Sequence, residues 1–418
     1  MARNIFTRIP ERGDVCIGRR ADKKIFYITA ESYDPSGIDQ TVYENQGVVF
    51  LRDDEGAHIV GLSSASKPWC SRQWHYISGQ QLDGEEHTAT FNIRTASADN
   101  WKTVVAKTFT YKATTDEALV EQLRAFFQAD EDMKAQDWWA DITTDGKVRV
   151  HFACKSEMQL NNNTSTGLVL GMPMPEVGVV NPFGLRKTGR TTEGSISNLA
   201  RAVLYYKTDR AATEWASGGV NKEQPLRPSG YPIGLPSYLG QSAKNPGDFC
   251  KTLRAYYGEG EEGWMNYMRA QMYHYPANRH DSGAAGSLAR TLDLAKHTYT
   301  SASVTTPTPC LPAATYCAQY ATGCTPAGQW YLGDAAEIAA LLDGVEYGAN
   351  PSRQSDILNK SLSLMDGTGV GNVQYLWSCV RAYRHAAWCA LGNLGFFICG
   401  YIPNGFLAVP LSLQQIKN

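Results

Sequence analysis

The chain has 418 residues, of which 43% are hydrophobic and 19% charged, with 38 glycines and 22 tyrosines, and this composition excludes a mainly disordered protein. Its net charge of −2 gives no basic excess to attract nucleic acid or an anionic membrane surface, so we expect neither as a partner. A chain of this length is expected to form about two or three domains.

The sequence also bears on the cellular compartment in which the protein folds. No run reaches the roughly 20 apolar residues that a membrane-spanning helix needs, so we expect no insertion into a membrane. The opening stretch, MARNIFTRIPERGDV, has no continuous apolar segment of the kind that directs secretion. We therefore expect folding in a cytoplasm, with the cysteines as free buried thiols rather than disulfides.

The N-terminal part is predicted to be rich in strands. Apolar runs indicate strands at 24–28, 47–51, 58–62 and 103–106. The short polar turn 53–56, which contains a glycine, separates the second run from the third and is typical of a β-hairpin.

Helical spacing begins after this strand-rich part. Apolar residues recur at the period of a helix over 114–128, and its start, Thr114 with Glu117, matches a capping box. The run 147–154 then alternates apolar and polar residues, as in a strand with one exposed face. His151 lies on the polar face, where we expect a solvated side chain rather than a metal ligand.

These patterns divide the chain into three segments. A polar break at 159–165 ends a β-rich first region, and we place a domain boundary there. The next segment is rich in glycine and proline, which predicts long ordered loops, and it is either an insert in the last domain or its start. The segments are 1–165, 166–289 and 290–418, with helical spacing in the second at 249–257 and 264–273.

Three short helices are predicted in the last domain. The first opens at Pro312 and can be capped by Gly323. The second begins at Asp334, which is spaced to form a capping box with Glu337. After the third helix the chain is predicted to continue as strands and turns. That third helix covers 351–365 and is expected to bury Ile357, Leu358 and Leu362.

No sequence pattern indicates catalysis or metal binding. The nucleophile motif G-x-S-x-G is absent. Cys310, Cys317 and Cys324 stand at spacings that match no standard zinc site. The glycine-rich run 367–371 follows a predicted helix rather than a strand, unlike a phosphate-binding loop. We therefore predict no catalytic residue, no metal ligand and no cofactor.

Short motifs in the last domain follow the order seen in one known family. They are Pro312 to Cys317, Gly328 to Leu332, Glu337-Ile338, Leu376-Trp377-Ser378, Ala387-Trp388, Gly405 and Ala408-Val409-Pro410. Over roughly residues 290–418 the chain resembles the C-type-lectin-fold variable proteins of diversity-generating retroelements, which include phage tail adhesins.

The resemblance carries expectations for fold and function. It implies an α+β fold, in which the β-rich N-terminal region precedes a C-type-lectin-like domain with long ordered loops. It implies a phage receptor-binding protein at the tip of a tail fibre, made in the host cytoplasm and attached to other virion tail proteins through residues 1–165. The expected partner is a bacterial surface receptor, either protein or glycan, and the expected assembly is a homotrimer, because several copies raise avidity.

In that family, adenines in certain template codons are randomised, and with a pyrimidine in third position such codons never encode Lys, Glu, Gln or Met. All four are absent from Cys379 to Leu407, which the resemblance makes a hypervariable segment. Its aromatic and arginine side chains are of the types that dominate binding hot spots. The candidate receptor-contact residues are Val380, Arg381, Tyr383, Arg384, His385, Cys389, Leu391, Asn393, Leu394, Phe396, Phe397, Ile398, Cys399, Ile402 and Phe406.

Other interpretations stay open. The nearest is a variable adhesin on a bacterial cell surface. An enzyme of the formylglycine-generating type, which shares the lectin-like fold, would need an activated cysteine pair, and Cys310 with Cys317 is the pair that the sequence offers. The apolar strands of the final segment could also be ordinary core strands. In either case Trp377, Trp388 and Val409 are assigned to the core.

Overall fold

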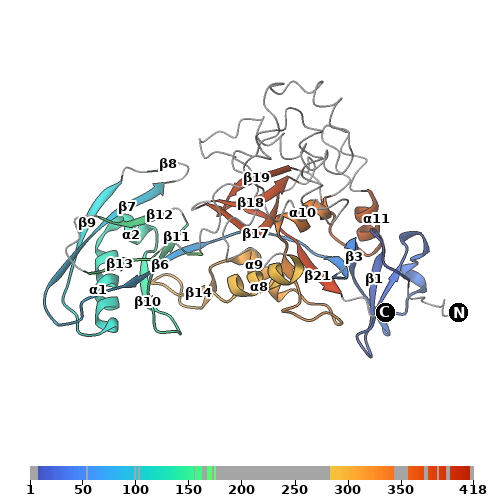
Figure 1. Cartoon of the computed structure of the whole chain (residues 1–418), viewed down its shortest axis with the longest axis horizontal. Helices are drawn as coiled ribbons and strands as arrows, with labels where there is room; N and C mark the ends of the chain where they lie inside the picture. The colour runs from blue at the N-terminus through green and yellow to red at the C-terminus, as the bar shows by residue number, and fades with distance from the viewer. Residues whose placement is uncertain are drawn as a thin grey trace, which may run out of the picture.

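The computed structural model describes much of the chain outside its middle. The described residues are 8–52, 55–97, 100–101, 104–154, 156–161, 167–171, 174–175, 283–342, 356–370, 375–383, 386–391 and 396–414. They form an elongated molecule, with β1 toward one end and helix α1 at the other (Figure 1). Strands and helices are mixed in these residues, which confirms the α+β class. The loops predicted within 173–182 and 225–236, and the helical spacing at 249–257 and 264–273, lie outside the described residues apart from two positions.

The N-terminal strands agree with the sequence patterns. Strands β3 and β4 are antiparallel, with Val48 opposite Val60, which confirms the predicted hairpin. Two short 3-10 helices, Ala30–Ser32 and Pro35–Gly37, lie between the second and third strands. The strands are β1 (Val15–Arg19), β2 (Ile25–Ile28), β3 (Tyr43–Arg52), β4 (Ala57–Gly61) and β5 (Ala65–Pro68).

Both ends of the chain contribute to one six-stranded sheet. Its order is β16-β21-β4-β3-β1-β2, where β16 is Tyr331–Leu332 and β21 is Pro410–Gln414. Strand β21 lies antiparallel to β4, with Leu411 opposite Val60. The N-terminal hairpin therefore gains its neighbouring strand from the far end of the sequence.

A second sheet, which we call the C-terminal sheet, has the order β19-β18-β17-β20-β5. Strands β17, β18 and β19 are antiparallel neighbours, whereas β20 runs parallel to β17 and antiparallel to β5. The N-terminal region thus supplies an edge strand to this sheet as well. The C-terminal strands are β17 (Tyr375–Tyr383), β18 (Ala386–Leu391), β19 (Phe396–Tyr401) and β20 (Gly405–Ala408).

Four helices pack with these two sheets around one hydrophobic cluster, which we call the shared core. The helix that opens at Pro312 and the capping box of Asp334 with Glu337 are both confirmed. In the third predicted helix Leu358 and Leu362 are buried as expected, but Ile357 is 58% exposed. The helices are α8 (Gly283–Ala295), α9 (Pro312–Gln319), α10 (Ala335–Leu341) and α11 (Asp356–Leu364).

The predicted cap at Gly323 is wrong. Helix α9 ends at Gln319, and its C-cap is Tyr320, whose backbone N–H bonds back to the last turn. Gly323 lies against a carboxylate instead, because a Cβ added there would stand 2.3 Å from an oxygen of Glu44. A close approach, rather than a helix end, requires this glycine.

Strands β6 to β13 form a separate body around helix α1, which we call the α1 body, at the left of Figure 1. Its two sheets have the orders β10-β11-β6-β13 and β12-β7-β9, with the short β8 paired to β7. Its elements are β6 (Arg72–Ser78), β7 (His87–Ser97), β8 (Asn100–Trp101), β9 (Val105–Tyr111), α1 (Asp116–Ala129), α2 (Glu131–Ala135), β10 (Trp139–Ile142), β11 (Val148–Ala153), β12 (Ser156–Leu160) and β13 (Val169–Leu170).

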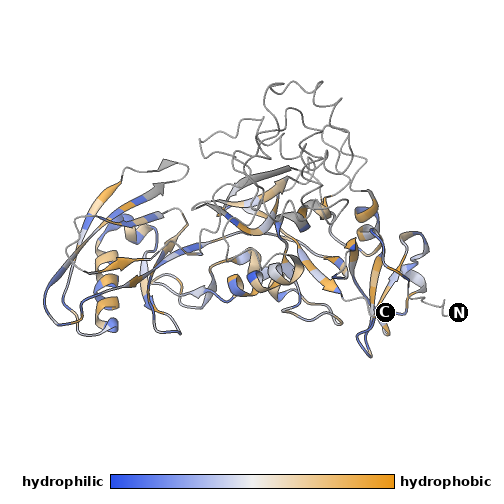
Figure 2. Ribbon diagram, viewed as in Figure 1, coloured by the Kyte–Doolittle hydropathy of each residue, from blue (hydrophilic) through white to orange (hydrophobic). Residues whose placement is uncertain are grey.

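The α1 body has its own hydrophobic core. Leu119, Leu123 and Phe127 of α1 are fully buried, and Trp138 stacks on Phe152 with ring centroids 4.4 Å apart. In Figure 2, hydrophobic residues gather on α1 and on strands of both cores, and hydrophilic residues on many connecting turns. This core is assembled from consecutive elements, unlike the shared core.

Helix α1 starts one residue later than the capping box predicted. Its N-cap is Thr115, whose side chain accepts a hydrogen bond from the backbone N–H of Ala118. Thr114 is exposed and lies outside the helix, so the pairing of Thr114 with Glu117 is not the cap that forms. The helix itself is confirmed.

The predicted domain boundary does not separate the two cores. Strands β1 to β5 belong to sheets that also contain β16, β20 and β21, so the first region contributes to the same core as the last. The α1 body is instead inserted between β5 and the C-terminal part. The predicted segments 1–165 and 290–418 therefore fold together in part, because β4 and β5 find their partners at the end of the chain. No described helix is both long and apolar enough to span a membrane.

The link between the two cores is a short stretch, residues 69–73, which we call the junction segment. Trp69 Nε1 donates to the Ser378 carbonyl oxygen at 2.8 Å, and the Cys70 N–H donates to that of Ile402 at 3.1 Å. The Ser71 N–H donates to the Cys310 carbonyl oxygen, next to the small sheet of β14 (Thr298–Tyr299) and β15 (Thr308–Pro309). These bonds fasten the junction segment to the C-terminal part of the chain.

Candidate functional site

The C-terminal sheet carries the predicted variable segment. Trp377 and Trp388 are fully buried and Val409 is 1% exposed, as the sequence predicted for these framework residues. Trp377 Nε1 donates to the Lys67 carbonyl oxygen at 2.9 Å, which ties β17 to β5 across the intervening β20. The sheet is therefore anchored by two large indole side chains and by the hydrogen bond of Trp377.

Four candidate contact residues are buried, which corrects their expected exposure. Val380, Arg381, Cys389 and Ile402 are between 0% and 3% exposed. For Val380, Arg381 and Cys389 the reason is that both faces of β17 and β18 are covered where they lie, and β17 bulges between Trp377 and Arg381, which shifts the alternation of its side chains. Ile402 follows β19 and is buried where its backbone meets the junction segment. Within the single chain these four side chains offer no surface to a receptor.

Phe406 is half-buried and belongs to an aromatic group. Its ring lies 4.5 Å from those of Tyr375 and Trp377, measured between centroids. Gly400 faces the same group, because a Cβ added there would stand 2.6 Å from the Phe406 ring and 2.8 Å from Trp377. Phe406 is therefore a partly exposed member of the frame.

The other candidates fall into two sets. The structure describes the backbone of six of them in the antiparallel strands: Tyr383, Leu391, Phe396, Phe397, Ile398 and Cys399. Arg384, His385, Asn393 and Leu394 lie outside the described residues, in the two chain segments that join β17 to β18 and β18 to β19.

Arg381 connects the C-terminal sheet with the α1 body. Its guanidinium donates to Gln73 Oε1 at 2.6 Å and to the Pro175 carbonyl oxygen. Gln73 in turn donates from Nε2 to the Cys154 carbonyl oxygen at 3.0 Å. A buried guanidinium with these partners positions strands rather than contacting a receptor.

A cluster of charged side chains lies beneath the junction. Arg149 binds Asp141 through two nitrogens, and His151 Nε2 lies 3.4 Å from the same carboxylate. Arg72 donates to His151 Nδ1 at 2.9 Å and pairs with Asp137 at 3.0 Å. The cluster joins β6, β10 and β11 through paired charged groups, within which His151 Nε2 makes no hydrogen bond.

The expectation that His151 is solvated is wrong. The residue is fully buried, because the polar face of β11 is covered by Arg72 and by Tyr299 of β14, whose ring centroid is 5.8 Å away. Burial lowers the pKa of His151 to about 4, against the opposing effect of the nearby Asp141 carboxylate. The alternation of apolar and polar residues in β11 could not reveal that residues distant in sequence bury its polar face.

A second buried polar group lies in the shared core. Glu337 accepts hydrogen bonds from Ser287 Oγ at 2.5 Å and from Tyr331 Oη at 2.6 Å, and His58 Nδ1 lies within 3.6 Å. These residue types occur in hydrolases, but Ser287, His58 and Glu337 are all 0% exposed. Without access for a substrate, the group serves to hold α10 against α8, β4 and β16.

The cysteine pair offered for enzymatic chemistry is fully buried. Burial raises the pKa of Cys310 to about 12 and that of Cys317 well above its ordinary value. Cys317 lies on α9 near Cys379, whereas Cys310 lies near Cys70. The described residues thus show no activated pair at these two positions.

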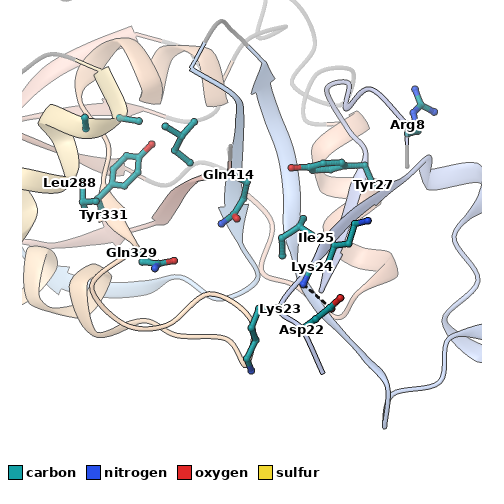
Figure 3. A pocket seen from close by; sticks show the side chains of 13 residues that line it. Arg8, Asp22, Lys23, Lys24, Ile25, Tyr27, Leu288, Gln329, Tyr331 and Gln414 are labelled. Carbon is teal, nitrogen blue, oxygen red and sulfur yellow. Dashed lines mark hydrogen bonds between the residues drawn. The ribbon is translucent and has the colours of Figure 1, made fainter. Parts of the chain in front are cut away.

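One groove of about 1010 Å³ lies far from the variable segment, between the β1–β2 turn, α8 and β21 (Figure 3). Its charged side chains have neighbours of their own: Asp22 pairs with Arg19, Lys23 donates to the Gly323 carbonyl oxygen, and Arg8 pairs with Glu11. None of the described candidate contacts lines it. The described part of the chain also contains no group of acidic, histidine or cysteine side chains arranged to hold a metal ion.

Comparison with protein-family models, with curated proteins and with solved structures finds no match to this chain. Sequence reasoning missed the junction segment and the polar cluster beneath it. The signal available was Arg72 and Gln73 between Trp69 and Trp74, since polar and charged residues seldom lie beside such apolar groups unless they are paired.

Proposed function

We propose that this chain is an adhesin, a phage receptor-binding protein that contacts a bacterial surface receptor through outward side chains of the predicted variable segment from Cys379 to Leu407. The observation that carries the proposal is that the predicted variable segment is fastened at both ends. It begins beside Trp377 and ends in β20, which pairs with β5 before β21 joins β4. Such a frame tolerates exchange of outward side chains, as in an antibody paratope.

The composition of the segment supports the same proposal. Between Cys379 and Leu407 the chain has no Lys, Glu, Gln or Met. Outside this segment the chain does carry such charged residues, and 11% of all its residues are aromatic. The C-type-lectin-like fold, the homotrimer and the tail-fibre location remain parts of this proposal. They follow from the resemblance, and avidity from several copies would allow each contact to be weak.

Within this proposal, the part of residues 1–165 that attaches to the virion is the α1 body. Strands β1 to β5 are built into the shared core, so residues 15–68 belong to the binding unit. The α1 body has its own core and lies at the opposite end from β1 (Figure 1). Although Arg381 of β17 is hydrogen-bonded to Gln73 of β6, the end of the α1 body that carries α1 points away from the C-terminal sheet (Figure 1), and this end is the part proposed to contact other tail proteins.

The test is binding of the fluorescently labelled protein to a panel of intact bacterial strains. Replacing Arg384, His385, Asn393 and Leu394 together by serine is expected to weaken binding to a recognised strain at least about tenfold, since hot-spot side chains dominate affinity. Thermal unfolding of the variant and of the parent protein checks that a loss of binding is not caused by loss of folding.

The matched control replaces four exposed charged residues of the α1 body by serine: Glu117, Glu121, Glu131 and Lys134. This variant should bind like the parent protein. The proposal fails if no strain binds the parent above background, or if the first variant binds as tightly as the control.

A further inference from the structure

An antiparallel arm lies between helices α8 and α9 in the sequence and meets the α1 body. It consists of residues 297–310, which we call the arm, and it contains β14 and β15 (Figure 1). The base of the arm is closed by the Cys310 N–H, which donates to the His297 carbonyl oxygen at 2.9 Å. Ser71 Oγ donates to the Pro309 carbonyl oxygen at 3.0 Å, so the base is fixed to the junction segment.

The far part of the arm contacts the α1 body through two side chains. The ring centroid of Tyr299 lies 4.5 Å from the guanidinium carbon of Arg72, and Ser301 Oγ donates to Asp137 Oδ2 at 2.6 Å. Arg72 pairs with the same Asp137 carboxylate at 3.0 Å and also donates to the Asp137 carbonyl oxygen. Both contacts of the arm therefore depend on Arg72, one directly and the other through Asp137.

The position of Arg72 depends in turn on a neutral His151. Arg72 Nε donates to His151 Nδ1 at 2.9 Å. An arginine guanidinium carries donors and no acceptor, so Nδ1 must accept this bond, and the proton of the neutral ring must lie on Nε2. Nε2 is the nitrogen that lies 3.4 Å from the Asp141 carboxylate.

A second proton on the His151 ring would have to bind to Nδ1. Two N–H groups would then face each other across 2.9 Å, one on an imidazolium and the other on a guanidinium. Because His151 is 0% and Arg72 3% exposed, water does not screen this repulsion. Arg72 must then move away from His151, and its contacts with Tyr299 and Asp137 are lost.

The surroundings of His151 do not remove this conflict. Burial lowers the pKa of His151 to about 4, although Asp141 favours the protonated ring. The Asp141 carboxylate is already bound by two guanidinium nitrogens of Arg149. The titratable and charged groups that face His151 or Arg72 are Arg149 of β11, Asp141 of β10, Asp137 before β10, Tyr299 of β14 and Cys310 after β15.

We propose that the arm is an acid-sensitive latch, in which protonation of His151 displaces Arg72 and releases the far part of the arm from the α1 body. Ser71 keeps the base of the arm attached, and the core of the α1 body stays folded. The proposal rests on the bond between Arg72 and His151 and on the two arm contacts that depend on Arg72. It requires no receptor and stands independently of the proposed adhesin function.

The expected size of the effect follows from the two states of His151. In the released state the ring meets solvent and has its ordinary pKa of about 6.5, whereas in the latched state the pKa is about 4. Between these pH values the released state binds a proton and the latched state does not. The released population should therefore rise by up to about 300-fold, which is ten raised to the difference between the two pKa values.

The test is hydrogen exchange of the folded full-length protein, measured by mass spectrometry at several pH values from 6.5 to 4. Each exchange rate is divided by the intrinsic rate of an unprotected amide at the same pH. We expect the protection of peptides from the arm to fall at least about tenfold over this range and to recover when the pH returns to 6.5. Peptides from α1 (Asp116–Ala129) and β21 (Pro410–Gln414) should keep their protection.

Two histidine variants locate the titrating group. His151→Asn keeps an acceptor near the position of Nδ1 but cannot be protonated, so protection of the arm should become independent of pH. The matched control is His297→Asn, which removes the histidine of the arm that stacks on Trp74 with ring centroids 4.8 Å apart. This control should keep the pH dependence of the parent protein.

Three results would overturn the proposal. The first is unchanged protection of the arm in the parent protein across the pH range. The second is an equal loss of protection in the arm and in α1, which would indicate unfolding of the α1 body rather than release of the arm. The third is a pH dependence that survives His151→Asn or disappears in His297→Asn. If a variant does not fold, the comparison of the arm with α1 in the parent protein still decides.

Discussion

The α1 body and the shared core are built in opposite ways. The α1 body gathers its buried residues from elements that follow one another, from Ile77 of β6 to Leu168 just before β13. The shared core joins Val60 of the first hairpin to Leu411 near the end of the chain. The inserted α1 body therefore depends on contacts between segments that are close in sequence. The part proposed to bind a receptor depends on contacts between segments that are distant in sequence.

Buried polar groups lie where each core contacts other elements of the molecule. In the α1 body, the charged cluster of Arg72, Arg149 and Asp141 faces the junction. In the shared core, Glu337 holds α10 to β16 and α8. Paired polar groups of this kind contribute little net stability, but they cost several kcal/mol when one partner is removed. They therefore specify how elements dock rather than how strongly.

The largest expected effect comes from deleting a buried indole in one core. Trp388→Ala should destabilise the shared core by about 3–5 kcal/mol, because a large cavity is left. If the two cores unfold separately, chemical denaturation followed by circular dichroism will show an early transition for the shared core and an unchanged one for the α1 body. Trp138→Ala should produce the reverse. A single shifted transition in both variants would show that the cores are one cooperative unit.

The next effect concerns pH and the α1 body. His151 has a folded pKa of about 4, below the value of about 6.5 in an unfolded chain, so it is neutral in the fold. Between these pH values the unfolded chain binds a proton here and the folded chain does not. The free energy of unfolding should therefore be complete above pH ~6.5 and fall by about 3 kcal/mol as the pH drops toward ~4.

The measurement is urea denaturation of the α1 body across this pH range. His151→Gln removes the titrating group and should flatten the slope, even if it lowers stability at every pH. An unchanged slope in this variant would assign the acid sensitivity to other residues, such as His297, whose pKa burial also lowers.

The smallest effect separates two adjacent threonines. Thr115→Ala should destabilise the α1 body by about 1 kcal/mol, because the side chain caps helix α1, whereas Thr114→Ala at an exposed position should change stability by less than about 0.5 kcal/mol. Thermal unfolding of the two variants gives the comparison. Equal losses would contradict the assignment of Thr115 as the cap.

Local features were predictable from the sequence, and non-local ones were not. The β3–β4 hairpin, helix α1 and the Asp334 capping box depend on residues a few positions apart. The sequence did not distinguish Thr114 from Thr115 as the N-cap, because the hydroxyl of either threonine can cap a helix. The point at which the preceding strand ends determines which of the two does so. The pairing of β21 with β4 leaves no local trace, since an apolar strand reveals no partner.

The candidate site shows the same limit. Trp377 and Trp388 were identified as core because large aromatic side chains are seldom exposed. Val380 and Arg381 were placed on the surface by residue type, but the bulge in β17 and the approach of Gln73 bury them. An arginine that binds partners in a distant strand has the same one-letter code as one that faces solvent, so sequence pattern alone cannot distinguish them.

The pairing of β4 with the last strand has a consequence for synthesis. As the chain leaves the ribosome, the β3–β4 hairpin emerges early and its open edge must wait for β21, while the α1 body can fold as soon as it emerges. An unprotected strand edge is a site of misassociation between nascent chains. A messenger that terminates before Leu411 should therefore yield a product with a completed α1 body and an aggregation-prone remainder.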